Sequence, residues 1–202
     1  MSKKQLFYIV FFSVLVVGFF ITLSAVVPGF VKQKVAPVSH VLPFSFVNQD
    51  GQLVNEKVLE GKVAAVNFFF TTCRGICPRM TNNLKPVYEA FRDEPDFVML
   101  SHTCDPSRDS VPVLRRYADS IGVNVSKWIF LTGAKDSLYS AARYSYKIDD
   151  PSNFGNGAES DFLHTQFIAL VDRQGDVVAV YDGIRPSEIN EMKSRIRKLL
   201  KQ

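Results

Sequence analysis

The two cysteines Cys73 and Cys77 are the residues whose type and spacing best support chemistry. Three residues separate them, and both lie in one short connection. Residues 63–70, an apolar run rich in Val and Phe, precede the pair, and Pro78, a residue favoured at the first position of a helix, follows it. In open α/β sheets, ligands gather at the carboxyl ends of strands, where such connections lie. The pattern therefore predicts a scaffold that presents two sulfur atoms at the end of a buried strand.

Two thiols in this position suit a metal ion or redox chemistry. The N-terminus of a helix lowers the pKa of a cysteine because its exposed N–H groups and its dipole stabilise the thiolate. Arg74 and Arg79 add positive charge beside the pair. Thiolates are ligands of soft metal ions, and copper(I) is the leading candidate. The pair could also close a disulfide, and two inert buried cysteines are the structural alternative.

The elements that must position the two thiols alternate between strand and helix. A closing hairpin is expected to add antiparallel strands to a central parallel region with helices on both faces. This order predicts a thioredoxin-like α/β fold. Pro86 is expected to kink or split the first helix, and Asp109 or Ser110 can cap the second. The expected elements are a hairpin at 44–54, strands at 63–70, 97–100 and 128–131, helices from Pro78 to about 94, at 111–121 and at 132–144, a hairpin at 167–181, and a helix from Pro186.

A third metal ligand has to come from elsewhere in the chain, and His164 is the best candidate. It follows a long polar loop at 149–162 and precedes a predicted strand, whose entrance lies beside the dithiol in a thioredoxin-like fold. Imidazole would complete a three-ligand copper(I) site and can stay bound to copper(II). A zinc site is also possible by ligand type. For His40 and His102, a packing role is the preferred interpretation.

The N-terminal segment predicts a single membrane anchor. Lys3 and Lys4 precede residues 6–27, which carry no charge over 22 residues and are long enough to cross a bilayer. The alternative is a cleavable signal peptide, although the apolar region of a signal usually has about 7–15 residues. The two lysines favour a cytoplasmic N-terminus. We therefore expect a single-pass inner-membrane protein with an anchor at 1–28, a linker at 29–41, and a thioredoxin-like copper-binding domain at 42–202 that faces the periplasm.

The charge balance gives no indication of nucleic-acid binding. Without Lys3 and Lys4, 22 basic residues stand against 20 acidic ones, and no basic stripe is present. The three cysteines are too few, and odd in number, for a secreted disulfide framework. In an oxidising compartment the thiols must be paired, bound to metal or kept reduced.

Three segments together resemble the Sco/SenC family. They are Thr-Thr-Cys-Arg-Gly-Ile-Cys-Pro at 71–78, Asp-Pro-Ser-Arg-Asp at 105–109, and Asp-Phe-Leu-His-Thr at 161–165. The resemblance implies a thioredoxin-like fold and copper bound through Cys73, Cys77 and His164. It also implies a role in assembling the CuA centre of cytochrome c oxidase, with an oxidase subunit or another copper-receiving protein as the partner.

The chain departs from the family pattern at two positions. Arg74 stands where the family commonly has Pro, and Leu163 stands where it commonly has Asp directly before the His. An acidic residue there would orient the imidazole through a hydrogen bond. Asp161 is a possible substitute for it.

Cys104 is the third cysteine and follows the predicted strand at 97–100, on the same sheet edge as the dithiol. A small buried residue is the preferred interpretation, since free cysteine is often buried. The alternatives are an extra metal ligand or a thiol that exchanges disulfides with Cys73 or Cys77.

Two functions from different classes remain for the dithiol. The first is a membrane-anchored copper chaperone, which passes copper to its partner by exchange of thiolate ligands. The second is an enzyme, a thiol–disulfide reductase that keeps the partner's cysteines reduced for metallation. A peroxidase of the peroxiredoxin kind shares the fold but would carry a single peroxidatic cysteine in a different motif.

Overall fold

The computed structural model describes residues 2–26, 36–149 and 165–202, which form two compact units, Met1–Ala36 and Pro37–Gln202. The first unit contains helix α1 (Lys3–Val26). Its segment Lys3–Ser24 is long and apolar enough to cross a membrane, a property that N-terminal signal sequences share. The predicted N-terminal apolar helix is therefore present, while its retention as an anchor stays a prediction.

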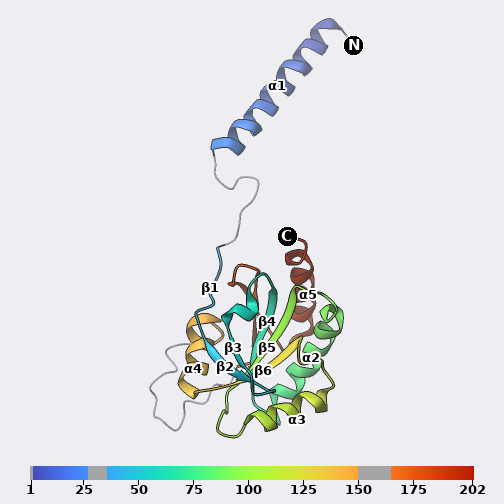
Figure 1. Cartoon of the computed structure of the whole chain (residues 1–202). Coiled ribbons are helices and arrows are strands. Elements are labelled where there is room, and N and C mark those ends of the chain that lie inside the picture. The colour runs from blue at the N-terminus through green and yellow to red at the C-terminus, as the bar shows by residue number, and fades with distance from the viewer. Residues whose placement is uncertain (1, 27–35, 150–164) are drawn as a thin grey trace. The chain divides into compact units, whose positions relative to one another are not determined.

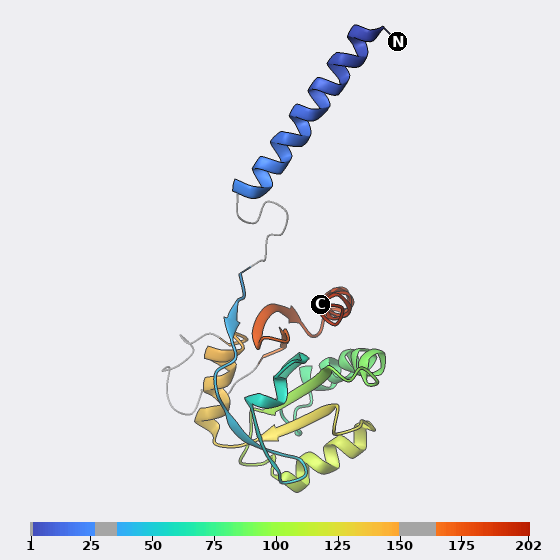
Figure 2. The same ribbon diagram turned by 45° about the horizontal axis from the view of Figure 1, so that its top comes forward.

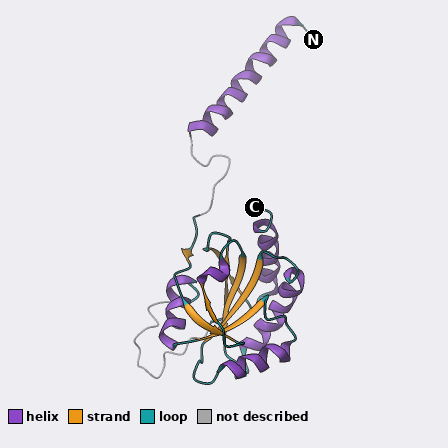
Figure 3. Cartoon of the chain, viewed as in Figure 1, coloured by secondary structure: helices purple, strands orange, loops and turns teal. Residues whose placement is uncertain are grey.

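The second unit is built on one mixed sheet, which has eight strands within the described residues (Figure 3). Strand β4 pairs in parallel with β5, and β5 with β6, whereas the other pairs are antiparallel. The predicted thioredoxin-like α/β fold is confirmed. In spatial order the strands are β1 (Ser39–His40), β8 (Asp176–Asp182), β7 (Phe167–Val171), β4 (Val63–Phe69), β5 (Phe97–Thr103), β6 (Trp128–Thr132), β2 (Ser45–Asn48) and β3 (Leu53–Asn55).

Helices cover both faces of this sheet. Figures 1 and 2 show α2 and α5 on one side and α4 on the other. Side chains of α3 join those of α2 and α5 in one hydrophobic cluster, while α4 contributes to a second. The helices are η1 (Glu56–Leu59), α2 (Ile76–Phe91), α3 (Val111–Ile121), α4 (Lys135–Ser140) with the π-helical turn η2 (Ala141–Ser145), and α5 (Pro186–Leu199).

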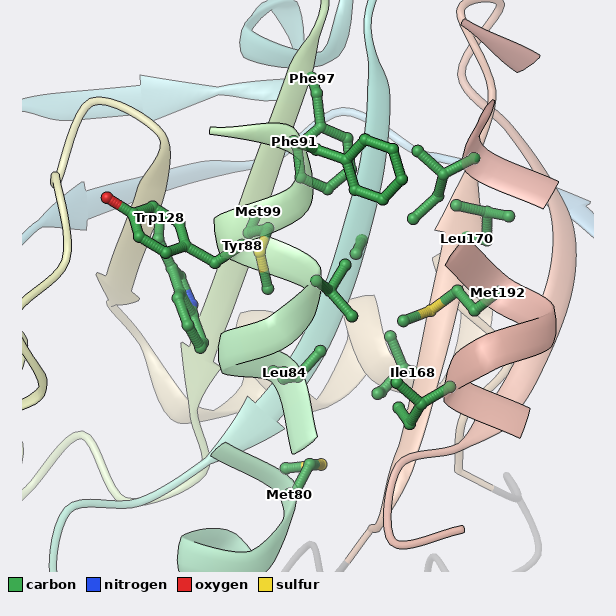
Figure 4. Packing of buried hydrophobic residues seen from close by; sticks show 14 of the residues in the cluster. Met80, Leu84, Tyr88, Phe91, Phe97, Met99, Trp128, Ile168, Leu170 and Met192 are labelled. Carbon is green, nitrogen blue, oxygen red and sulfur yellow. The ribbon is translucent and has the colours of Figure 1, made fainter. Parts of the chain in front are cut away.

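The central strand β4 is buried along its whole length because both faces of the sheet are covered. Its side chains alternate, so Ala65 and Phe69 join the cluster beneath α2 and α5, while Val66 and Phe68 join the one beneath α4. Figure 4 shows the first cluster, in which residues of α2, such as Leu84, face Met192 of α5 and Ile168 of β7. Two packed layers thus fix the carboxyl end of β4, where the cysteines follow.

Helix α2 differs from its prediction in two respects. It begins at Ile76 rather than at Pro78, so Cys77 lies in its first turn. It also continues through Pro86 as one helix, so of the kink or split expected there the split does not occur. Proline removes one backbone hydrogen bond, but Pro86 and Asn82, whose carbonyl loses that bond, are both exposed. Water can therefore donate a hydrogen bond to the Asn82 carbonyl, and the buried side chains of α2 keep the helix packed on the sheet.

Two further expectations need adjustment. Ser110 occupies the N-cap position of α3, but no side chain donates or accepts a capping hydrogen bond there. Asp109 has a different role, described below.

At the start of the Pro37–Gln202 unit, Ser39 and His40 fall within the predicted linker 29–41, yet they pair with β8 and belong to the folded unit.

Candidate functional site

Cys73 and Cys77 meet where β4 passes into α2. Strand β4 ends at Phe69, and α2 begins at Ile76 with Gly75 as its N-cap, a residue without a capping side chain. The backbone N–H of Cys77 donates a hydrogen bond to the sulfur of Cys73 at 3.4 Å. The sulfur of Cys73 therefore takes the place of the missing capping side chain, in the positive field of the helix N-terminus.

The two thiols differ in exposure and in acidity. Burial tends to raise the pKa of Cys73, but hydrogen bonds from the Cys77 thiol and from the backbone N–H groups of Cys77, Gly75 and Ile76 outweigh it, and the pKa is lowered. Burial, together with the hydrogen bond and negative charge of Cys73, raises the pKa of Cys77 to about 12. Cys73 is half-buried, whereas Cys77 is 4% exposed. Cys73 is thus the more acidic and more accessible thiol of the pair, and Cys77 is the thiol that holds its proton more tightly.

We expect the reduced, metal-free protein to be alkylated by iodoacetamide at Cys73 at least about 100-fold faster than at Cys77 at pH 7, because only the thiolate attacks. The Cys73 rate should fall as the pH drops through its lowered pKa, whereas Cys77 should become reactive only as the pH approaches its raised pKa. Mass spectrometry of timed samples across a pH series measures both rates. In a Cys77→Ala variant the Cys73 profile should shift to higher pH. Faster labelling of Cys77 than of Cys73 would contradict the assignment.

A buried carboxylate that sequence patterns did not single out as part of the site fixes the loop before Cys73. Asp109 is 0% exposed. It accepts hydrogen bonds from the Thr71 backbone N–H at 3.1 Å, from the Thr71 hydroxyl, and from the Thr103 hydroxyl at 2.5 Å. Thr71 lies two residues before Cys73, and Thr103 ends β5. The carboxylate therefore ties the dithiol loop to the neighbouring strand. The sequence offered Asp109 only as a possible helix cap and as the last residue of the segment 105–109, and neither signal pointed to Thr71 or Thr103 as its partner.

The remaining cysteine and a histidine lie on the opposite face of the sheet. Cys104 is 2% exposed and belongs to the cluster beneath α4, whereas Cys77 belongs to the cluster beneath α2. Burial raises the pKa of the Cys104 thiol. His102 is 0% exposed, and burial lowers its pKa to about 3, so its imidazole is neutral.

Among the residues that the structure describes, no three His, Cys, Asp or Glu side chains are grouped closely enough to hold a metal ion. Cys73 and Cys77 supply two soft ligands. His164 lies outside the described residues, as do Leu163 and Asp161, so its place as third ligand stays a prediction. The segment that follows His164 does lie beside α2, because the Gln166 carbonyl accepts a hydrogen bond from the Gly183 N–H at 2.8 Å, and the Asn83 side chain of α2 donates to the Gly183 carbonyl at 2.9 Å.

Comparison with known protein families shows which family this chain belongs to. The family model SCO1/SenC matches residues 33–201. The chain belongs to the SCO1/SenC family. It is 30% identical over 159 residues to the SCO1 protein homolog of Bacillus subtilis, an alignment that covers 78% of this chain and 81% of the relative.

Solved Sco structures share the fold and show what relatives of this SCO1/SenC chain bind. BsSco, a member of the Sco family of cytochrome c oxidase assembly proteins in which a disulfide switch was identified, superposes with a TM-score of 0.69 at 28% identity, covering 84% of this chain and 98% of BsSco. Copper-bound ScoI of Arabidopsis thaliana superposes with a TM-score of 0.64 at 26% identity, covering 81% and 99%. Copper is therefore a ligand of solved Sco homologues, as the resemblance implied.

Proposed function

We propose that this protein is a copper carrier that delivers copper to the CuA site of cytochrome c oxidase. The observation that carries the proposal is the Cys73 sulfur at the N-terminus of α2, which accepts the Cys77 N–H beside a second free thiol. Two thiols there form a donor pair for a soft ion. The copper-bound relative indicates that the cargo is copper. The family's link to cytochrome c oxidase assembly indicates that the destination is the oxidase.

In this proposal copper is the cargo, and Cys73, Cys77 and His164 hold it. The Cys73 thiolate is the point of entry because its pKa is already lowered. The Cys77 thiol, whose pKa is raised, releases its proton when the metal takes the proton's place. His164 adds an imidazole, which can stay bound if copper changes its oxidation state. Release runs through ligand exchange, in which cysteines of the partner replace Cys77, Cys73 and His164 one at a time.

The apolar helix α1 fits the same role as a membrane anchor. Its segment Lys3–Ser24 can cross a bilayer. Lys3 and Lys4 favour a cytoplasmic N-terminus, which puts the copper-binding unit on the periplasmic side of the inner membrane. An anchor confines the carrier to the membrane in which its partner, an oxidase subunit, is embedded.

A thiol–disulfide reductase is the second candidate, and the unequal acidity of the two thiols favours it. A thiolate at Cys73 attacks a partner disulfide, and the thiol of Cys77 then resolves the mixed disulfide. The products are a reduced partner and a Cys73–Cys77 disulfide, so two electrons and two protons pass to the partner. This chemistry needs no imidazole ligand.

Replacing His164 with alanine separates the two functions. A copper carrier should lose copper affinity and fail to restore CuA in cells that lack the protein, while its dithiol still reduces a test disulfide. The measurements are a copper titration of the full chain in detergent against a competing chelator, and the CuA absorption of isolated membranes. His40→Ala, a change at an exposed histidine in β1, is the matched control. Full CuA assembly by His164→Ala would reject the copper carrier and favour the reductase.

A further inference from the structure

The segment that carries the dithiol has basic residues and no acidic ones. Residues 71–88, which include most of α2, contain Arg74, Arg79 and Lys85 but neither Asp nor Glu. All three basic residues are exposed, and none of them forms an ion pair among the described residues. Arg74 and Arg79 stand closest to the two cysteines along the chain, so the surface around the dithiol carries two positive charges without a counter-charge.

The two arginines stand where a helix disfavours positive charge. Arg79 lies in the first turn of α2, and Arg74 directly precedes Gly75, the N-cap. The helix dipole makes this end positive, so acidic residues stabilise the first turn and basic residues destabilise it. Helix α2 has no acidic residue in its first turn. The stability of the helix therefore does not account for these charges, and a role at the surface does.

Neighbouring carboxylates at the same edge of the sheet are paired with other arginines. Strand β5 is parallel to β4, and β8 also runs in the direction of β4 because two antiparallel pairings separate them. After β5, Asp105 pairs with Arg108 at 3.5 Å. After β8, Asp182 and Glu188 both pair with Arg185, at 3.2 Å and 3.6 Å. These acidic groups are therefore not the partners of the two arginines beside the dithiol.

We propose that Arg74 and Arg79 form a docking surface for an acidic segment of the partner protein, in which Asp or Glu side chains flank the cysteine that exchanges with Cys73. The inference rests on the proposed function, because it names the chemistry of the partner at that same site. Complementary charge speeds the encounter of two proteins and suppresses wrongly charged partners. Arginine suits this role because its guanidinium can bind a carboxylate through two parallel hydrogen bonds.

The test measures the partner preference of Cys73 in the absence of copper. Full-length Cys77→Ser protein in an uncharged detergent reacts with one of two short peptides, whose single cysteine is activated as a 2-pyridyl disulfide. Asp residues flank this cysteine in one peptide, and Lys residues flank it in the other. The Cys73 thiolate attacks the peptide sulfur, a Cys73–peptide disulfide forms, and the released pyridine-2-thiolate takes up a proton. The absorbance of pyridine-2-thione gives the rate, and mass spectrometry verifies that Cys73 carries the peptide.

The ratio of the two rates reports the docking surface. At about 0.01 M salt we expect the acidic peptide to react about 10-fold faster than the basic one, and at about 1 M salt the ratio should approach one. Arg79→Glu should lower the low-salt ratio, and Arg74→Glu with Arg79→Glu should bring it below one. Lys198→Glu is the control matched to Arg79→Glu and should leave the ratio unchanged. Lys198 is exposed near the end of α5, which lies at the opposite edge of the sheet, where Arg173 of the β7–β8 turn donates to the carbonyl of residue 200.

The ratio is independent of changes in the thiol itself, because a change in the acidity of Cys73 alters the rates of both peptides equally. The single tryptophan, Trp128, is buried in the same unit, and its fluorescence verifies that each variant is folded. A low-salt ratio near one in the Cys77→Ser protein, or a ratio that the double charge reversal leaves unchanged, overturns the proposal. The copper carrier is decided separately by the His164→Ala titration, since this assay contains no copper.

Discussion

Replacing Asp109 with alanine is expected to lower the free energy of unfolding of the Pro37–Gln202 unit by about 3–4 kcal/mol. The carboxylate is fully buried and accepts hydrogen bonds from two groups of Thr71 and from the hydroxyl of Thr103. Alanine leaves these donors without an acceptor in a water-poor interior, and each such group carries a penalty. Urea unfolding of the full chain in detergent, followed by Trp128 fluorescence, measures the loss.

Two matched variants make this result specific. Asp109→Asn keeps an oxygen acceptor but not the charge, so its loss should be smaller than that of Asp109→Ala. Asp119→Ala removes an exposed carboxylate of α3 that pairs with Arg115 at 3.2 Å, and we expect a change below about 1 kcal/mol. If Asp109→Ala were as stable as Asp119→Ala, the buried carboxylate would not hold the loop.

Weakening the Asp109 hydrogen bonds should also change the geometry of the dithiol. Thr71 lies two residues before Cys73, and the loop between them is held by backbone bonds such as that from Cys73 to Phe70, at 3.2 Å, and by the Asp109 contacts. A loop released from Asp109 no longer presets the position of the Cys73 sulfur against α2. Copper affinity of the folded Asp109→Asn variant should therefore fall, since a preorganised site binds with less ordering cost.

Sequence patterns were sufficient for the elements whose signals are local. The apolar run at 63–70, in which Asn67 is the only polar residue, predicted a strand covered on both faces, and β4 is buried at every residue. The helical spacing in the C-terminal segment predicted α5, whose residues Ile189, Met192 and Ile196 are all buried. The dithiol was found from its place between strand and helix, because that place depends only on neighbours along the chain.

Features that depend on contacts between distant segments were not predictable. Asp109 could be read as a helix cap because capping is a local signal, yet its partners lie 38 and 6 residues away, at Thr71 and Thr103. His102 was assigned a packing role, and no local signal in the sequence shows that neither of its ring nitrogens has a hydrogen-bond partner among the described residues. The interruption expected at Pro86 was wrong because tertiary packing of α2 outweighs one lost backbone bond.

A second large effect is expected at the buried ion pair of Arg143 and Asp149. Arg143 Nε lies 2.7 Å from the Asp149 carboxylate, and the two side chains are 2% and 10% exposed. Arg143→Met fills similar space but removes the guanidinium from a carboxylate that is already withdrawn from water. Breaking one side of a buried pair costs about 3–5 kcal/mol, and urea unfolding followed by Trp128 fluorescence should show a loss of this size.

A double variant distinguishes the electrostatic effect of the Asp149 charge from lost packing. If losing the guanidinium beside the Asp149 carboxylate lowers the stability, Arg143→Met combined with Asp149→Asn should be more stable than Arg143→Met alone, because the second change removes the charge. Arg92→Met breaks an exposed pair with Glu89 at 2.9 Å and should cost less than about 1 kcal/mol. Arg143 also lies 5.5 Å from the Tyr139 ring, and the Tyr139 hydroxyl donates to the Cys104 carbonyl at 3.0 Å. If the stability lost in the double variant equals the sum of the losses in Arg143→Met and Asp149→Asn, the effect comes from these other contacts of Arg143. The ion pair would then not be what holds η2 beside the end of β5.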